Sequence, residues 1–162
     1  MGKKILHIDM DGVICRFDEG VRILSPETDT KNYSKEVDEI CRNNPYIFHY
    51  LKPLKDAVPS VKELFNHFDV YFLSTPMWHV PLSYIGKRLW IEEHFGNLSE
   101  KRLILTHRKD LVIGDYLVDD TTRNGVAEFK GEHIHFGSEK FPDWKSTLEY
   151  LKTKHHGNTI SN

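Results

Sequence analysis

The chain has 162 residues, of which 39% are hydrophobic and 28% charged, and its formal net charge is -2. This length and composition suit one folded domain with a core of its own, and they exclude a disordered or fibrous chain. The near-neutral charge argues against a protein that coats nucleic acid, because such proteins normally carry an excess of cations.

Apolar runs and helical spacings predict an alternation of strands and helices. In chain order they predict a strand at Ile5–Ile8, helical structure around Ser34–Arg42, a helix from Val58 to Phe65, a strand at Val70–Leu73, a helix from Leu82 to Phe95, strands at Leu103–Leu105, Tyr116–Val118 and His133–Phe136, and a helix from Trp144 to Leu151. This alternation predicts an α/β fold, with a parallel sheet and helices on both faces. Ligands bind such sheets beyond the carboxyl ends of the strands.

Residues 18–50 interrupt the alternation with a polar, partly helical stretch. This stretch is too small to fold alone. We therefore predict a single domain over residues 1–162, with a small helical cap inserted at about residues 18–50, after the first strand.

Polar residues follow three of the predicted strands. They are Asp9 and Asp11 after the first strand, Ser74 and Thr75 after "VYFL", and Asp119 and Asp120 after "YLV". Carboxylates from two strands would repel each other at one edge of the sheet unless a cation lay between them. Oxygen ligands favour a hard ion such as Mg²⁺, which also binds phosphate oxygens. With donors from Ser74 and Lys109, these residues predict a phosphoryl-transfer site.

Four motifs resemble those of the haloacid dehalogenase (HAD) superfamily: "DMDGV", "FLSTP", Lys109 and "LVDD", in the family order from Asp9 to Asp120. Within the superfamily the chain is most similar to the 5'(3')-deoxyribonucleotidases. The similarity rests on "DMDGVICRF", "STP", "LKPLKDAV" and "LTHRKDLVIGDYLVDD", and it extends from about Lys3 to Gly125.

The resemblance implies a HAD-like Rossmannoid fold and Mg²⁺-dependent hydrolysis of a phosphate monoester through an aspartyl-phosphate. An aspartate is a usable nucleophile because it is ionised at neutral pH. Asp9 would be the nucleophile, and Asp11 would protonate the leaving oxygen and then accept a proton from water. The family's metal ligands correspond to Asp9, the backbone carbonyl of Asp11, and Asp120, with Asp119 as a supporting residue.

The implied substrate is a small phosphate, above all a deoxynucleoside monophosphate. Ser74, Thr75 and Lys109 would contact the phosphate, and Lys109 is chosen over the neighbouring basic residues by its spacing to the acidic pair. Phe17 would contact the nucleobase, although a core aromatic is an equally good interpretation. The insertion is shorter than the family's usual cap, and its aromatics are Tyr33, Tyr46, Phe48 and Tyr50. Base preference, sugar preference and the choice of a 5' or 3' phosphate therefore stay open.

A second reading of the fourth motif ends the strand at "LVIGD", which would make Asp115 the metal ligand. We prefer "YLVDD", because Lys109 would otherwise crowd the start of the strand. Trp78, Trp90 and Trp144 are expected to be core or boundary residues.

Two rival functions stay open beside the nucleotidase. One is a HAD phosphatase for another small phosphate or for a nucleic-acid end, although the near-neutral charge makes nucleic acid an unlikely partner. The other is a catalytically weak nucleotide-binding module, in which we would expect Asp9 or Asp11 to be lost. Two cysteines are too few for a disulfide framework, so we expect a reducing, cytoplasmic compartment. No apolar run approaches the roughly 20 residues of a membrane span, and no feature predicts the oligomeric state.

Overall fold

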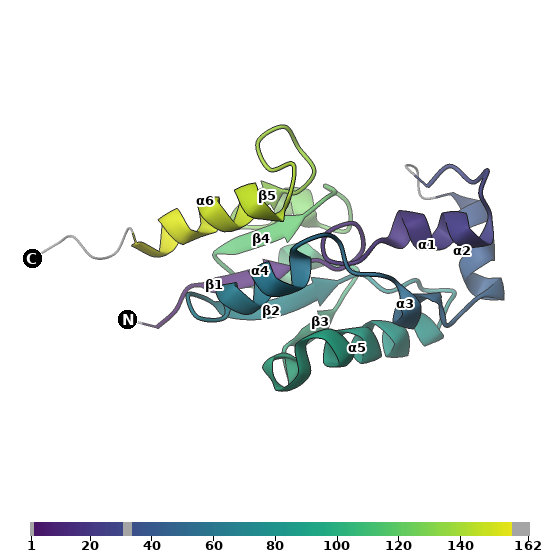
Figure 1. Ribbon diagram of the computed structural model, residues 1–162, viewed down its shortest axis with the longest axis horizontal. Coiled ribbons are helices and arrows are strands. Elements are labelled where there is room, and N and C mark those ends of the chain that lie inside the picture. The colour runs from purple at the N-terminus through teal and green to yellow at the C-terminus, as the bar shows by residue number, and fades with distance from the viewer. Residues whose placement is uncertain (1, 31–33, 157–162) are drawn as a thin grey trace, which may run out of the picture.

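The computed structural model describes residues 2–30 and 34–156, which form a parallel sheet with helices around it (Figure 1). The strands are β1 (Ile5–Ile8), β2 (Asp69–Ser74), β3 (Leu103–Leu105), β4 (Tyr116–Asp119) and β5 (Glu132–His135). Their order in the sheet is β3-β2-β1-β4-β5, and every neighbouring pair is parallel. The predicted strands and the predicted α/β fold class are confirmed.

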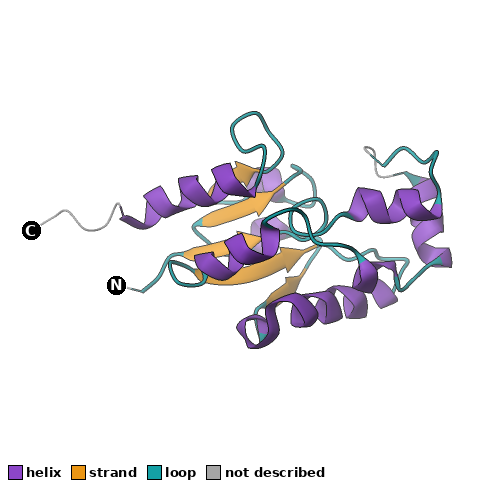
Figure 2. Ribbon diagram, viewed as in Figure 1, coloured by secondary structure: helices purple, strands orange, loops and turns teal. Residues whose placement is uncertain are grey.

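In the described residues, six α-helices and three short 3-10 helices lie between the strands and after the last one. They are α1 (Phe17–Leu24), α2 (Lys35–Asn43), α3 (Ile47–Tyr50), α4 (Ala57–Leu64), α5 (Leu82–Phe95), η1 (Gly96–Ser99), η2 (Lys109–Leu111), η3 (Val126–Glu128) and α6 (Trp144–His156). Figure 2 shows α1, α2 and α3 grouped beyond one end of the strands, away from α4 and α6. Helices thus occupy the stretch where we expected the cap insertion.

The two faces of the sheet are covered unequally. Side chains alternate between faces along each strand, and on β1 Leu6 and Ile8 join a large core to which α4, α5 and α6 contribute. The opposite face carries a smaller cluster, which includes Leu73 and Leu117. Phe129 and the 3-10 helix η3 cover that cluster. The long helices therefore pack on one face, and short helices and loops close the other.

The inserted helices leave and rejoin the sheet region at one point. The backbone N–H of Arg16 donates to the carbonyl of Lys52, and that of Leu54 donates to the carbonyl of Ile14, both at 2.8 Å. Cys15 and Pro53 form an antiparallel bridge between these hydrogen bonds. The chain segments that enter and leave the insertion are therefore paired with each other.

Helix α5 forms where predicted, but its buried face differs from the one that the apolar spacing suggests. Ile85 and Leu89, which belong to the apolar spacing that predicts this helix, are 54% and 37% exposed. Gly86, Lys87 and Trp90 are buried instead. Gly86 lies against α3, where an added Cβ would come within 2.8 Å of the Phe48 Cβ. Close packing of two helices thus selects the small residue for the buried face.

Candidate active site

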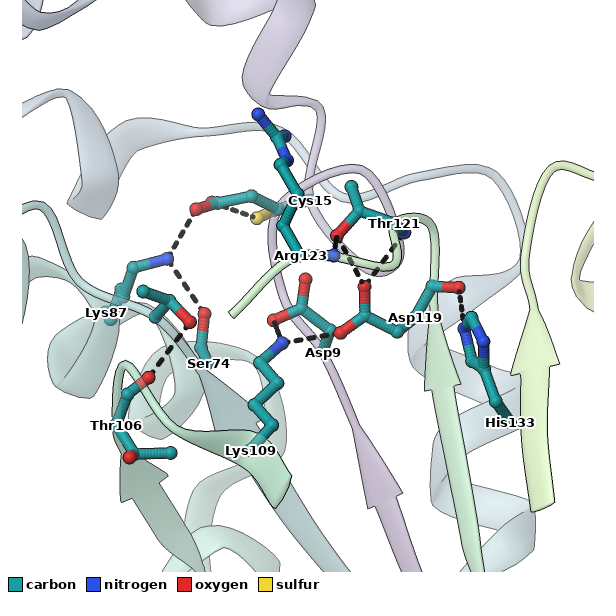
Figure 3. A network of polar contacts seen from close by, with 12 residues as sticks. Asp9, Cys15, Ser74, Lys87, Thr106, Lys109, Asp119, Thr121, Arg123 and His133 are labelled. Carbon is teal, nitrogen blue, oxygen red and sulfur yellow. Dashed lines mark hydrogen bonds and ion pairs between the residues drawn. The ribbon is translucent and has the colours of Figure 1, made fainter. Parts of the chain in front are cut away.

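Three adjacent strands bring the predicted site residues to one edge of the sheet. Asp9 follows β1 at the centre, Ser74 ends β2 on one side, and Asp119 ends β4 on the other. The N–H of Asp9 donates to the carbonyl of Val118 at 2.9 Å, which continues the pairing of β1 with β4 to the site itself. Figure 3 shows these side chains converging above the strand ends.

The turn after Asp9 is compact, and it depends on Gly12. The carbonyl of Met10 accepts hydrogen bonds from the N–H groups of Val13, Ile14 and Cys15. Gly12 has a φ of +75°, and a Cβ at this position would lie 2.2 Å from the Asp120 Oδ2. A side chain there would be strained and would also collide with a site carboxylate. Glycine therefore lets the first and fourth motifs touch.

Lys109 lies between two of the site carboxylates. Its Nζ donates to Asp9 Oδ1 at 2.8 Å and to Asp119 Oδ2 at 2.5 Å, and the residue is 2% exposed. Burial alone would lower the pKa of Lys109, but the Asp9 and Asp119 carboxylates outweigh it and raise the pKa. The other Asp119 oxygen accepts from the backbone N–H and the hydroxyl of Thr121. Both Asp119 oxygens are thus engaged within the protein.

Three carboxylates share this corner of the site. Asp9, Asp119 and Asp120 offer ligand atoms that all lie within 4.8 Å of one another. Burial, with repulsion from Asp9, raises the pKa of Asp119 to about 6. Burial, with repulsion from Asp9, Asp119 and Asp11, raises the pKa of Asp120 to about 8. An all-oxygen group with this excess of negative charge fits a hard divalent cation such as Mg²⁺. We call this group, with Lys109, the carboxylate cluster.

Asp11 faces a different partner. The ammonium of Lys87, from α5, donates to Asp11 Oδ2 at 2.5 Å and to Ser74 Oγ at 3.0 Å. The thiol of Cys15 donates to Asp11 Oδ1 at 3.4 Å. Burial, with the Asp11 charge, raises the pKa of Cys15 well above its usual range, so the thiol stays protonated and can donate. We call Asp11, Ser74 and Lys87 the Lys87 cluster.

Thr75 and Asp115 lie in settings that their sequence positions did not reveal. The Thr75 hydroxyl donates to the backbone carbonyl of Thr106 at 2.9 Å, so its proton is used within the protein. The Asp115 Oδ2 accepts from the N–H of Ile5 at 2.8 Å. Ile5 starts β1, whereas Asp9 follows its end. Asp115 therefore lies at the opposite end of the sheet from the site, which favours the "YLVDD" reading of the fourth motif.

A pocket of about 580 Å³ opens above the two clusters. Asp9, Asp11, Ser74, Lys109 and Asp120 line its inner part. This volume is in the range of sites that take small organic ligands. Arg123 adds a cation to the wall. The pocket therefore joins the strand-end carboxylates to a space that could hold a small phosphate compound.

Aromatic side chains from the insertion form one wall of this pocket. Phe17 and Phe48 both line it, and their rings stack with centroids 5.7 Å apart and planes 17° from parallel. Of the other insertion aromatics, Tyr46 and Tyr50 are 64% and 75% exposed and border a separate outer groove. Tyr33 lies outside the described residues. Among the described aromatics of residues 18–50, Phe48 is thus the one that borders the pocket.

The expectation for the tryptophans is wrong at one position. Trp90 and Trp144 are buried, and their indole N–H groups donate to the carbonyls of Leu51 and Val13. Trp78 is 73% exposed and lines the pocket beside His107, with ring centroids 5.7 Å apart. It lies in the stretch of residues 74–79 that lines the pocket, and there the neighbouring Met77 is buried in the core while the Trp78 side chain is exposed.

Lys87 is the residue of this site that the sequence analysis missed. It occupies the buried stripe of α5 that also carries Ser83, Gly86, Trp90 and Ile91. A lysine at helical spacing from small and aromatic buried residues is a signal that could have identified it. The spacing of the apolar residues Ile85 and Leu89 suggested another buried face of α5, so Lys87 was not recognised as buried. Phe48 was likewise recognised as a cap aromatic but given no role.

Three further features of the described residues concern metal ligands, cysteines and membrane spans. The described part of the chain holds no group of three or more potential metal ligands apart from Asp9, Asp119 and Asp120. Cys15 and Cys41 are both buried and free. Within residues 2–30 and 34–156, no helix has the length and apolar character needed to cross a membrane.

Comparison with known sequences identifies relatives of this chain. Residues 25–146 match the model of a family described as 5' nucleotidase, deoxy (pyrimidine), cytosolic type C. A protein of Vibrio phage KVP40 is 46% identical over 152 residues, which covers 94% of this chain and 86% of the phage protein. A protein of Staphylococcus aureus strain Mu50 is 29% identical over 182 residues, covering 93% of this chain and 97% of its own. Both relatives carry the provisional name 5'(3')-deoxyribonucleotidase.

Comparison with solved structures supports the fold. A haloacid dehalogenase-like family hydrolase from Xanthomonas campestris superposes with a TM-score of 0.61 at 10% sequence identity. The match covers 95% of this chain and 97% of the hydrolase. At this identity the likeness concerns the fold alone, which is HAD-like as the four motifs suggested.

Proposed function

The chain belongs to the family described as 5' nucleotidase, deoxy (pyrimidine), cytosolic type C, and from this membership we propose its reaction. As a member it is a phosphatase of the nucleotidase type. The proposed reaction is Mg²⁺-dependent dephosphorylation of deoxynucleoside monophosphates through an aspartyl-phosphate on Asp9. The observation that carries this proposal is the meeting of Asp9, Asp11 and Lys109 on the floor of one pocket with an aromatic wall.

Asp9 is the proposed nucleophile. Lys109 holds its Oδ1, and an Asp9 oxygen attacks phosphorus in line with the ester bond. The bond between phosphorus and the sugar oxygen breaks, and Asp11 gives its proton to that oxygen. The nucleoside leaves, and the phosphoryl group stays bonded to Asp9.

Water then restores the enzyme. Asp11, now a carboxylate, accepts a proton from a water molecule whose oxygen attacks phosphorus. The bond between phosphorus and Asp9 breaks, and inorganic phosphate leaves while Asp9 regains its carboxylate. One carboxylate thus serves both half-reactions as acid and then as base.

Mg²⁺ would be held by Asp9, Asp120 and the backbone carbonyl of Asp11, with Asp119 supporting the site through Lys109. When bound, the ion offsets the negative charge of the phosphate and of the carboxylates around it. Ser74 ends β2 and lines the same pocket, and its hydroxyl would contact a phosphate oxygen. Thr75 would contribute through its backbone, because its hydroxyl proton is used by Thr106.

Phe17 is the proposed contact for the nucleobase. Its ring lies on the pocket wall, stacked on Phe48, so one face is supported by the protein. Stacking of a base on an aromatic ring contributes about 1–3 kcal/mol and tolerates different bases. This arrangement supports a nucleoside rather than a bare sugar phosphate as the substrate.

The test is release of inorganic phosphate from a panel of monophosphates, with Mg²⁺ and with EDTA. The panel holds dUMP, dTMP, dGMP, UMP, 3'-dTMP, a sugar phosphate and p-nitrophenyl phosphate. We expect deoxynucleotides to be preferred and all activity to be lost in EDTA. The rates with dUMP and UMP measure the preference for the sugar. The rates with dTMP and 3'-dTMP measure the preference for a 5' or a 3' phosphate.

Two results would change the proposal. Activity confined to the sugar phosphate or to p-nitrophenyl phosphate would keep the phosphatase chemistry and remove the nucleotide substrate. If no substrate of the panel releases phosphate in the presence of Mg²⁺, the nucleotide-binding module is favoured. Binding of dUMP, measured by calorimetry, would then support that module.

A further inference from the structure

Lys87 is a fully buried lysine that does not reach the substrate pocket. Its residue exposure is 0%, and it is absent from the pocket wall. Burying an ammonium is unfavourable unless it is paired and hydrogen-bonded. An apolar side chain of similar length would fit this helix position without that cost. The placement therefore calls for a role in the site that depends on the charge.

The surroundings of the Lys87 ammonium direct it toward Asp11. It donates to Asp11 Oδ2 at 2.5 Å and to Ser74 Oγ at 3.0 Å. The Phe48 ring covers another side, with its centroid 5.2 Å from the Nζ. Ammonium and ring attract each other, and the ring keeps water away. The charge of Lys87 therefore acts mainly on Asp11 and Ser74.

The contacts distinguish the two oxygens of Asp11. Oδ2 is fixed by the ammonium, whereas Oδ1 receives the weak thiol contact of Cys15 at 3.4 Å. The Asp11 side chain is 26% exposed, so one part of it faces the pocket. Oδ1 is thus the less strongly held of the two oxygens.

We propose that Lys87 is a positioning residue that fixes the Asp11 carboxylate for proton transfer to the leaving oxygen and from water. The proposal rests on the proposed function, because it assigns Lys87 a part in that same reaction. Lys87 does not touch the substrate and acts through Asp11. Its loss should therefore slow the steps that need proton transfer and spare those that do not.

The experiment compares two leaving groups in single-turnover kinetics. Phenyl phosphate needs its leaving oxygen protonated, whereas p-nitrophenyl phosphate leaves as a stable anion. In Lys87→Met we expect phenol release to fall by ~10²-fold or more, the scale of a general acid's contribution, and p-nitrophenol release by less than about tenfold. Equal losses for both substrates would overturn the proposal, since a merely structural role would slow both alike.

A double-mutant cycle with Asp11→Asn tests whether Lys87 acts through Asp11. We expect Lys87→Met to change phenol release by less than about twofold when Asp11 is already Asn. A full additional loss in that background would overturn the proposal. Arg88→Met is the matched control, because Arg88 lies next on α5 with an exposed side chain paired to Glu92. It should leave release from both substrates unchanged.

Folding and substrate choice are controlled separately. Thermal unfolding is compared for every variant, and Lys87→Gln, which keeps a donor without the charge, replaces Lys87→Met if the latter does not fold. The same leaving-group pattern, smaller in size, is expected for Lys87→Gln. Wild-type protein that cleaves aryl phosphates but no nucleotide would remove the proposed substrate and leave the Lys87 test valid. Cleavage of neither, with Mg²⁺ present, would overturn both proposals.

Discussion

The two buried lysines of the site serve clusters with different charge balance. Lys109 supplies one positive charge to a group of three carboxylates, Asp9, Asp119 and Asp120. Lys87 supplies one positive charge to a single carboxylate, Asp11. The carboxylate cluster is therefore short of positive charge, whereas the Lys87 cluster is balanced within the protein.

This difference in charge balance gives the two clusters different chemical properties. On the unbalanced side, burial and the neighbouring carboxylates raise the pKa of Asp120 to about 8, and the group fits a divalent cation. The balanced side needs no added ion, because the Lys87 ammonium already offsets the charge of Asp11. Two aspartates separated by one residue thus lie in different electrostatic surroundings, and the proposed mechanism gives them different roles on that basis.

The largest effect is expected for Asp9→Asn. An amide cannot act as the nucleophile, so release of phosphate from dUMP should fall by at least ~10⁴-fold. The fold should persist, which thermal unfolding checks. Asp18→Asn serves as the control, because Asp18 is exposed and lines the same pocket. Near wild-type turnover in Asp9→Asn would end the nucleophile assignment.

A second effect should separate the two clusters. In Asp11→Asn, turnover of dUMP should fall by ~10²–10⁴-fold, because the acid and base are lost. Mg²⁺ affinity, measured by calorimetry, should change by less than about threefold, because the Asp11 side chain is outside the group of Asp9, Asp119 and Asp120. Loss of Mg²⁺ binding in this variant would break the division between the clusters.

Stability without metal should depend on pH through Asp120. Its pKa is raised to about 8 in the folded protein from an ordinary value of 3.8, so between these values the folded state keeps a proton that the unfolded chain has lost. The free energy of unfolding should therefore fall as pH rises through this window, by about 1.4 kcal/mol per pH unit from this group alone.

Urea unfolding in EDTA between pH 5 and pH 9 measures this slope. Asp120→Asn should flatten it, and so should saturating Mg²⁺ in the wild type, because the ion favours the ionised carboxylate. If the free energy of unfolding changes with pH equally in the wild type and in Asp120→Asn, the pKa of Asp120 is not raised in the folded protein.

The smallest effect is expected outside both clusters, at Phe17. In Phe17→Ala the KM for dUMP should rise by about tenfold, in keeping with the loss of ~1–3 kcal/mol of stacking. Hydrolysis of p-nitrophenyl phosphate and Mg²⁺ affinity should stay within about twofold of the wild type. A large drop in kcat for both substrates would instead assign Phe17 to the core that supports Asp11.

Much of this architecture could be predicted from the sequence, because strand and helix periodicities and strand-end motifs are local signals. Asp9, Asp11, Ser74 and Asp120 were recognisable because each follows a buried apolar run. Lys87 was not, since its partner Asp11 is 76 residues away and the distance closes only when α5 packs beside β2. Trp78 was misjudged for a related reason: an aromatic at a pocket rim has the same local sequence features as one in a core.

The paired ends of the insertion have a consequence for how this enzyme type can diversify. Arg16 and Leu54 bond to the opposite segment at the base of the insertion, so the sheet is insensitive to the length of the chain between them. Doubling a loop closed in this way costs only about 0.6 kcal/mol of closure entropy. The aromatic wall of Phe17 and Phe48 lies on the helices α1 and α3, whereas Asp9 and Asp119 lie at strand ends. Under the proposed function, replacement of the insertion would change the range of substrates and leave the strand-end carboxylates in place.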